Sequence, residues 1–236
     1  MIHEYGLTIG PSKIHIKTDK REAIPEAVKE VKYHVRLLKE YVGRNPTFQY
    51  SLEPLKDDPD APLIAKLMID ASRAAGVGPM ASVAGVIADL GLRKLLEMGA
   101  GVAIVEDGGE IAAYTSSRDI VVAISTNESY LSGRIGLLVE HEDTPLGIAT
   151  TTGIANQKTI SFGMADSVTV IAENAAIADA AATSICNTVL GVDPWKSISR
   201  GVERAKGIKG VRGVIISYGG YIGLFGKLPR IIKISE

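Results

Sequence analysis

The chain has 236 residues, of which 46% are hydrophobic and 22% are charged, and its 26 basic and 27 acidic residues leave a formal net charge of -1. This supply of apolar residues is ample for a folded core, either as one large domain or as two closely packed halves. The balanced charge argues against a broad electrostatic surface for nucleic acid or for an anionic membrane.

A single cysteine and four scattered histidines restrict the metal and redox chemistry. Cys186 alone rules out an internal disulfide and a thiolate zinc site, which suits a reducing compartment. Residues 1–20 carry charges throughout and lack the apolar core of a signal peptide, and no apolar run elsewhere reaches the length of a bilayer span. We therefore expect a cytoplasmic protein without a membrane segment.

The chain opens with apolar residues that alternate on both sides of the turn Gly10-Pro11-Ser12, a pattern that predicts a hairpin. From Ile24 to Val42 the apolar residues recur at helical spacing and predict a helix. Phe48, Tyr50 and Leu52 alternate again, which favours a short strand.

The rest of the chain divides into short segments with helical or strand patterns. Helices are predicted at Leu63 to Ala75, Met80 to Met98, Ala175 to Val189 and Pro194 to Lys206. Strands are predicted at Val102 to Val105, Ile111 to Tyr114, Ile120 to Ile124, Ile135 to Val139, Val168 to Ala172, Val214 to Tyr218, Tyr221 to Phe225 and Ile231 to Ile234.

Residues 111 positions apart correspond to one another: Ile104 with Ile215, Gly108 with Gly219, and Ile120 with Ile231. Two helices and three strands share this register, so the spacing indicates an internal duplication. Short loops between consecutive strands favour antiparallel pairing over a parallel doubly wound sheet, which needs a helix between strands. We expect an α+β fold in one domain, 1–236, with an N-terminal hairpin and helix and two pseudo-repeats, about 45–125 and 134–236. Their antiparallel sheets lie side by side with helices on one face.

The predicted helix from Ala175 is nearly free of bulky side chains, so a ligand or another backbone can approach it closely. Asp179 and Thr183 are four residues apart and share one helical face. A carboxylate and a hydroxyl suit Mg²⁺, which often takes its other ligands from water and nucleotide phosphates. The same spacing also occurs where both side chains merely hydrogen-bond to the backbone.

Two further segments combine glycine with polar groups. The turn Glu106-Asp107-Gly108-Gly109-Glu110 allows close backbone approach beside acidic side chains, and the loop Thr150-Thr151-Thr152-Gly153 carries hydroxyls that can donate to phosphate. Ser161-Phe162-Gly163 precedes the strand that leads to the Asp179 helix. As plain structure, the first is a hairpin turn and the second a simple loop.

These motifs belong to a set of five segments: Val77-Gly78-Pro79-Met80-Ala81-Ser82-Val83-Ala84-Gly85-Val86-Ile87-Ala88, Glu106-Asp107-Gly108-Gly109-Glu110-Ile111, Thr151-Thr152-Gly153, Ser161-Phe162-Gly163-Met164-Ala165-Asp166 and Ala178-Asp179-Ala180-Ala181-Ala182-Thr183. Together with the N-terminal helix, they resemble a cytoplasmic branch of the ApbE-like family, which is related to the FAD:protein FMN transferases. Each segment is short, but their combination is specific.

The resemblance implies an ApbE-like fold of two related T-fold halves, in agreement with the repeat. It also implies that the chain binds FAD or FMN together with Mg²⁺, and that FMN is transferred to a threonine of an acceptor protein. Within this resemblance Asp179 and Thr183 hold the cation. Gly108-Gly109 and Thr152-Gly153 border the flavin pocket, with Glu106, Thr151, Ser161 and Gly163 beside them.

The chain also departs from the family pattern. The transferases carry a segment of the type His-x-x-Asp-Pro-x-Thr-Gly before the strand that precedes the metal helix, whereas Gln157 to Gly163 has no such histidine, proline or Thr-Gly pair. The branch often has a histidine after its Thr/Ser-Ser-Gly, where this chain reads Ile154-Ala155-Asn156-Gln157. Because transfer needs a base for the acceptor hydroxyl, the catalytic residue stays unassigned.

Two functions from different classes therefore remain open. The first is a flavin- or nucleotide-binding protein with a Mg-type site and FMN transferase activity. The second is a non-catalytic accessory protein in sulfur assimilation and homocysteine formation, an association that members of this branch carry. A purely structural module is a third alternative. Because sheets of this kind leave open edges that a second copy can cover, we also expect a homodimer.

Overall fold

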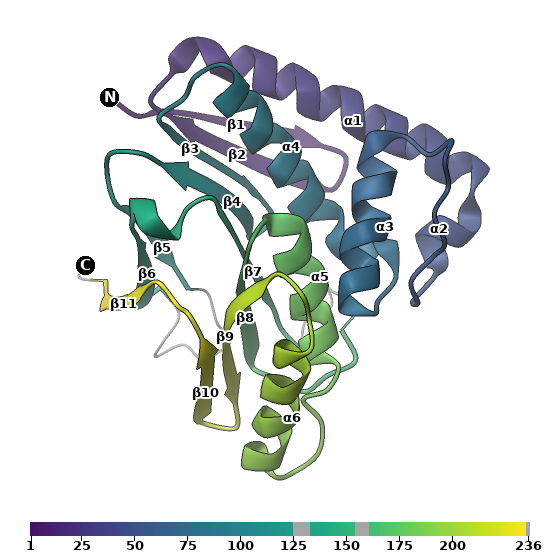
Figure 1. The fold of residues 1–236 in the computed structure, drawn as a ribbon, viewed down its shortest axis with the longest axis vertical. Coiled ribbons are helices and arrows are strands. Elements are labelled where there is room, and N and C mark those ends of the chain that lie inside the picture. Colours follow the sequence, from purple (N-terminus) through teal and green to yellow (C-terminus); the bar gives the residue numbers. More distant parts are fainter. Residues whose placement is uncertain (125–132, 154–160, 235–236) are drawn as a thin grey trace.

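The structure is a computed structural model, and it describes residues 1–124, 133–153 and 161–234. An eight-stranded antiparallel sheet forms the middle layer, with the helices on one face and a three-stranded sheet on the other (Figure 1). This arrangement confirms the predicted α+β class with helices packed on one face of antiparallel strands.

The first half contains the N-terminal hairpin, four α-helices and three further strands. Their bounds are β1 His3–Ile9, β2 Ser12–Thr18, α1 Ile24–Arg44, α2 Pro46–Tyr50, α3 Leu63–Ala75, α4 Val83–Glu97, β3 Val102–Asp107, β4 Glu110–Thr115 and β5 Ile120–Ala123. Short 3₁₀ turns at Arg21–Ala23 and Pro79–Ser82 lead into α1 and α4.

The second half contains six strands and two helices, with a 3₁₀ turn at His141–Asp143. Their bounds are β6 Ile135–Val139, β7 Leu146–Thr151, β8 Ser167–Ala172, α5 Ala175–Cys186, α6 Pro194–Lys206, β9 Val211–Tyr218, β10 Tyr221–Gly226 and β11 Arg230–Lys233. The order α3-α4-β3-β4-β5 in the first half is matched by the order α5-α6-β9-β10-β11 in the second.

The main sheet has the strand order β1-β2-β3-β4-β7-β8-β9-β10. Each group of four strands consists of two hairpins, and the helices lie in the chain between these hairpins. The groups meet where β4 pairs with β7, with Ile111 opposite Ile148. The hairpin β1-β2 occupies the place in the first group that β7-β8 occupies in the second, while the limits of the two pseudo-repeats remain a prediction. Strands β1 and β10 form the outer edges.

The small sheet has the order β11-β6-β5 and covers the face of the main sheet that the helices leave free. Its buried side chains include Val122, Leu137 and Val139, and they pack on Ile148 and Ile171 of the main sheet. Alternate residues of the main strands therefore point to two different cores. This second layer was not anticipated from the sequence.

Two predictions of local structure are wrong. Residues Pro46–Tyr50 form helix α2 instead of the predicted strand, because Pro46 at the first helical position starts a helical turn that buries Phe48. Thr150 and Thr151 belong to strand β7 instead of a loop, and Thr150 pairs across the sheet with Thr169.

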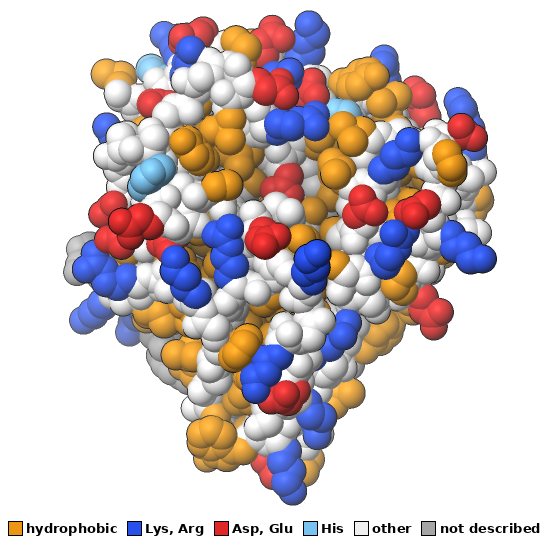
Figure 2. Space-filling model, in the orientation of Figure 1, with side chains coloured by type: hydrophobic (Ala, Val, Ile, Leu, Met, Phe, Trp, Pro, Cys, Tyr) orange, Lys and Arg blue, Asp and Glu red, His pale blue; other side chains and the backbone are white. Residues whose placement is uncertain are grey.

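The helices contain few candidates for membrane insertion. Within residues 1–124, 133–153 and 161–234, no single helix is long and apolar enough to cross a bilayer, although α3 and residues Pro79–Glu97 meet the length and composition test as a pair bent by 98°. On the face shown in Figure 2, acidic and basic side chains are intermixed without an extended area of one sign.

Helices α4 and α5 approach one another at Gly85. A Cβ atom there would lie 2.2 Å from the carbonyl oxygen of Ala175, a backbone atom that cannot move aside. Replacing Gly85 with alanine is therefore expected to lower the free energy of unfolding by about 2 kcal/mol, although alanine favours helix. Urea unfolding measures the effect, with Gly43→Ala in α1 as control. No atom lies within 4 Å of that position, so the control should be neutral or stabilising. An equal response of both variants would contradict the close packing.

Candidate functional site

Helix α5 carries Asp179 at its contact with the start of α4. The helix begins at a cap formed by Asn174, whose side chain accepts a hydrogen bond from the amide of Ile177 at 2.9 Å. One turn further, Oδ2 of Asp179 accepts a hydrogen bond from the amide of Gly85 at 3.0 Å. Asp179 and Thr183 are both half-buried. The predicted pair therefore lies on a helix that the start of α4 approaches closely.

The β3-β4 hairpin places two more carboxylates on the helix-bearing face of the sheet. Asp107 and Glu110 are directly opposite each other across the Gly108-Gly109 turn. Strand alternation gives them the same direction as Val105 and Ala112, which belong to the core beneath the helices. Glu106 lies one residue out of phase, so Asp107 and Glu110 face α5 while Glu106 has the direction of the opposite face.

The two glycines of this turn have positive φ angles of 70° and 121°. Such a backbone conformation favours glycine, and a two-residue turn brings the flanking residues into register. The side chain of Asp107 is 2% exposed, and its Oδ2 atom has no hydrogen-bond partner among the described residues. Hydrogen bonds from the Ser12 side chain and the Lys13 amide to this carboxyl lower its pKa, but Oδ2 itself stays open to a cation or a donor.

The carboxyls of the hairpin and of α5 raise one another's pKa. Burial raises the pKa of Glu110 well above the usual range, and the charge of Asp179 adds to the shift. Burial also raises the pKa of Asp179, with contributions from Asp107 and Asp89, while hydrogen bonding to the Gly85 amide opposes it. The pKa of Asp107 is likewise raised by burial. Among the described residues, no lysine, arginine or histidine compensates these three groups.

The predicted Thr/Gly segment ends beside the glycine turn. Because β7 runs antiparallel to β4 from Ile148 opposite Ile111, its C-terminal end continues alongside the Gly108-Gly109 turn. Thr151 is buried and shares the direction of Ala149, toward the helices. After it, Thr152 is half-buried, and the amide of Gly153 donates to the carbonyl of Ala165 at 2.8 Å.

Ser161 and Gly163 join this region to the far end of α5. The hydroxyls of Thr151 and Ser161 are 3.2 Å apart and hydrogen-bonded. A Cβ atom on Gly163 would lie 1.7 Å from the carbonyl oxygen of Cys186, so this segment packs directly on the last turn of the helix. The thiol of Cys186 is buried, and burial raises its pKa to about 11, which keeps it in the unreactive thiol form.

The structure therefore brings most of the predicted residues to one region along α5, whereas Glu106 points to the opposite face of the sheet. The charge of Asp179 acts on Glu110, the turn lies beside the end of β7, and Thr151 hydrogen-bonds to Ser161. Sequence reasoning gave no specific role to Asp107, Glu110 and Gly85. The two-residue glycine turn was a signal for pairing Asp107 with Glu110, whereas the contact of Gly85 with Asp179 depends on packing between distant helices. Residues 154–157, where the branch often has a histidine, lie outside the described residues.

Solved structures place this fold among known proteins. The chain matches the apo crystal structure of the flavinyl transferase ApbE from Pseudomonas stutzeri with a TM-score of 0.61 and 14% identity, over 96% of this chain and 94% of that chain. The ApbE protein of Thermotoga maritima also gives 0.61 and 14%, over 94% and 96%. At this identity the likeness defines the fold, which is that of the ApbE proteins.

Sequence comparison defines the family. A family model described as "AbpE bacteria" matches residues 3–206. The UPF0280 protein of Methanococcus vannielii is 38% identical over 98% of this chain and 93% of its own length. That of Methanothermobacter thermautotrophicus is 39% identical over 96% and 86%. The chain belongs to this ApbE-like family, together with the UPF0280 proteins, and the resemblance stated from its motifs is confirmed.

Proposed function

We propose that the protein binds a flavin nucleotide together with Mg²⁺ between α5 and the β3-β4 turn, and that it transfers FMN from FAD to a threonine of an acceptor protein. The observation that carries this proposal is the uncompensated cluster of Asp107, Glu110 and Asp179, with one buried carboxylate oxygen that lacks a partner. We place this activity in the cytoplasm.

The donor set of the site fits a hard divalent cation. Carboxylate and hydroxyl oxygens are the ligands that Mg²⁺ takes from proteins. Within the described part of the chain, no three Asp, Glu, His or Cys side chains come close enough to hold a metal by themselves. In our proposal Asp179 and Thr183 would hold the cation directly, and waters and nucleotide phosphates would complete its shell. Asp107 and Glu110 would balance its charge from the hairpin.

The remaining groups suit a flavin nucleotide. Gly108 and Gly109 have no side chains, so a pyrophosphate can approach the turn closely. The hydroxyls of Thr151, Thr152 and Ser161 can donate to phosphate or flavin oxygens. When bound, Mg²⁺ would neutralise the negative charge of the pyrophosphate.

Glu110 is our choice for the missing base. Its carboxyl is half-buried, and burial together with the charge of Asp179 raises its pKa to about 9, so Glu110 is protonated at neutral pH in the cation-free protein. A cation held at Asp179 would favour the ionised carboxylate that a base requires. In the proposed reaction the threonine oxygen bonds to the phosphorus of the FMN moiety and the bond to AMP breaks. The Glu110 carboxylate takes the hydroxyl proton.

A titration with FAD tests the binding step. We expect quenching of flavin fluorescence in Mg²⁺ and at least about a tenfold weaker affinity in EDTA, since a cation held by Asp179 would neutralise the phosphate charge. FMN without its AMP moiety serves as the control ligand and should bind with less dependence on Mg²⁺. Absence of quenching in both buffers would refute the proposed flavin site.

The accessory function in sulfur assimilation is the second candidate. The missing histidine motif between Gln157 and Gly163 favours it. Incubation with FAD, Mg²⁺ and a threonine-containing acceptor peptide separates the two functions by mass spectrometry. Covalent FMN on the acceptor supports the transferase, while FAD binding without transfer supports the accessory protein. The predicted homodimer is independent of this result.

A further inference from the structure

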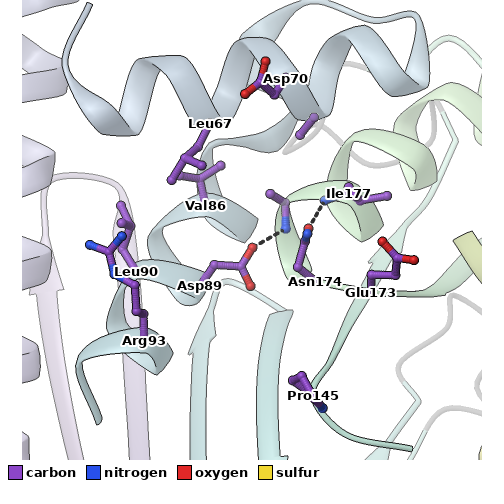
Figure 3. A pocket seen from close by; sticks show the side chains of 12 residues that line it. Leu67, Asp70, Val86, Asp89, Leu90, Arg93, Pro145, Glu173, Asn174 and Ile177 are labelled. Carbon is purple, nitrogen blue, oxygen red and sulfur yellow. Dashed lines mark hydrogen bonds between the residues drawn. The ribbon is translucent and has the colours of Figure 1, made fainter. Parts of the chain in front are cut away.

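A cavity of about 440 Å³ opens where α3, α4 and the first turn of α5 meet (Figure 3). Leu67 of α3, Val86 and Leu90 of α4, and Ile177 of α5 give it an apolar lining. This volume is in the range of small-molecule sites. None of the lining residues belongs to the proposed flavin and cation site.

The first amides of α5, which border this cavity, are not free to bind an anion. The two carboxylate oxygens of Asp89 accept hydrogen bonds from the amides of Ala175 at 2.9 Å and Ala176 at 2.8 Å. The next amide, that of Ile177, donates to the side chain of Asn174. The groups that normally attract a phosphate or carboxylate to a helix N-terminus are therefore already occupied by the protein.

The charge around the cavity is negative. Asp89 lies in the lining, and the exposed carboxylates of Asp70 and Glu173 stand at its rim on two different segments (Figure 3). Asp70 also lies 3.8 Å from the guanidinium of Arg73, an exposed pair that contributes little. Arg93 also borders the cavity, but its guanidinium pairs with Glu30 at 3.3 Å and with Glu97 at 3.6 Å. Its charge is thus matched by groups outside the cavity.

We propose that this cavity binds a small molecule that has an apolar body and one positively charged amine. The apolar body would pack on Leu67, Val86 and Ile177, where it is removed from water. The ammonium group would lie toward Asp70 and Glu173, with the buried charge of Asp89 behind it. An apolar lining with a few charged groups that fix the orientation is the usual design of such sites.

Three ligands with one apolar body and different head groups test this charge preference. Phenylbutylamine, phenylbutanol and phenylbutanoate are titrated into the full chain by calorimetry at pH 8 and low salt, where screening is weak. We expect the amine to bind about tenfold more tightly than the alcohol, and the carboxylate to bind most weakly. Equal affinities for amine and alcohol would overturn the proposal, as would a Kd above about 10 mM for all three.

Surface variants locate the binding. The double variant Asp70→Asn, Glu173→Gln changes exposed side chains only, so it should fold, and it should lower the affinity for the amine about fivefold without altering that for the alcohol. Glu22→Gln, an exposed acid near the start of α1, is the matched control and should change neither affinity. Leu67→Trp, which fills the cavity, should abolish binding of both ligands. An unchanged amine affinity in the double variant would place the binding elsewhere. FAD binding by these variants should match that of the parent chain, so this outcome is separate from the proposed flavin function.

Discussion

Raising the pH from 5 to 8 is expected to lower the free energy of unfolding of the cation-free protein by at least about 3 kcal/mol, the effect of only about two of the pKa units by which the buried acids are shifted. Glu110, Asp179 and Asp89 all have raised pKa values in the folded state, the last at about 6. The folded chain therefore holds protons that the unfolded chain has released, and each release costs stability. The loss begins above the unfolded pKa, near 4, and continues through the folded values.

Mg²⁺ should reverse this loss at pH 8, because a bound cation favours the ionised carboxyls and stabilises only the folded chain. Urea unfolding in EDTA and in Mg²⁺ at several pH values measures both effects. In the Glu110→Gln variant the free energy of unfolding without metal should depend less on pH. In the Glu22→Gln variant its pH dependence should match that of the parent chain. Stability that rises between pH 5 and 8 without metal would contradict the buried acidic cluster.

Asp179→Asn is expected to weaken cation binding about a hundredfold. The amide keeps an oxygen that can accept the hydrogen bond from Gly85, so the α4-α5 contact should persist. The negative charge is lost, and with it the strongest ligand for Mg²⁺. In the absence of metal the variant should be more stable than the parent at pH 8, because repulsion from Asp107 and Asp89 is relieved.

Calorimetry with Mg²⁺, or electron paramagnetic resonance with Mn²⁺, measures this affinity directly. Asp166→Asn is the matched control, since Oδ2 of Asp166 accepts a hydrogen bond from the amide of Gly219 at 2.7 Å in the second glycine turn. It should leave cation affinity unchanged. Thr183→Val should weaken Mg²⁺ binding about tenfold, because it removes a neutral hydroxyl ligand. If Asp179→Asn binds Mg²⁺ as tightly as the parent, the cation does not lie at α5.

The order of elements was predictable because the duplication repeats its spacing, but two segments were not. At Phe48 to Leu52 five residues cannot distinguish strand from helix, and Pro46 decided the outcome. In β7, Gly147 weakens the strand pattern. A Cβ atom there would lie 2.1 Å from the backbone of Asn174, so this glycine serves the packing of α5 on the sheet. Such a reason is visible only in three dimensions.

The candidate site was predictable to a similar degree. Helical spacing placed Asp179 and Thr183 on one face, and the motifs named the turn and the loops. The pairing of Asp107 with Glu110 followed from a two-residue turn, but their position opposite Asp179 depends on how α5 crosses β4 and β7. The occupied helix start at Asp89 depends in the same way on the contact between α4 and α5.

The three-stranded sheet joins the two halves of the chain into one folding unit. Strand β6 pairs on one side with β5, from the first half, and on the other with β11, the last strand of the second. Each half thus completes a layer that the other half needs. We infer that neither half folds as an independent unit, because each would leave its part of the small sheet unpaired.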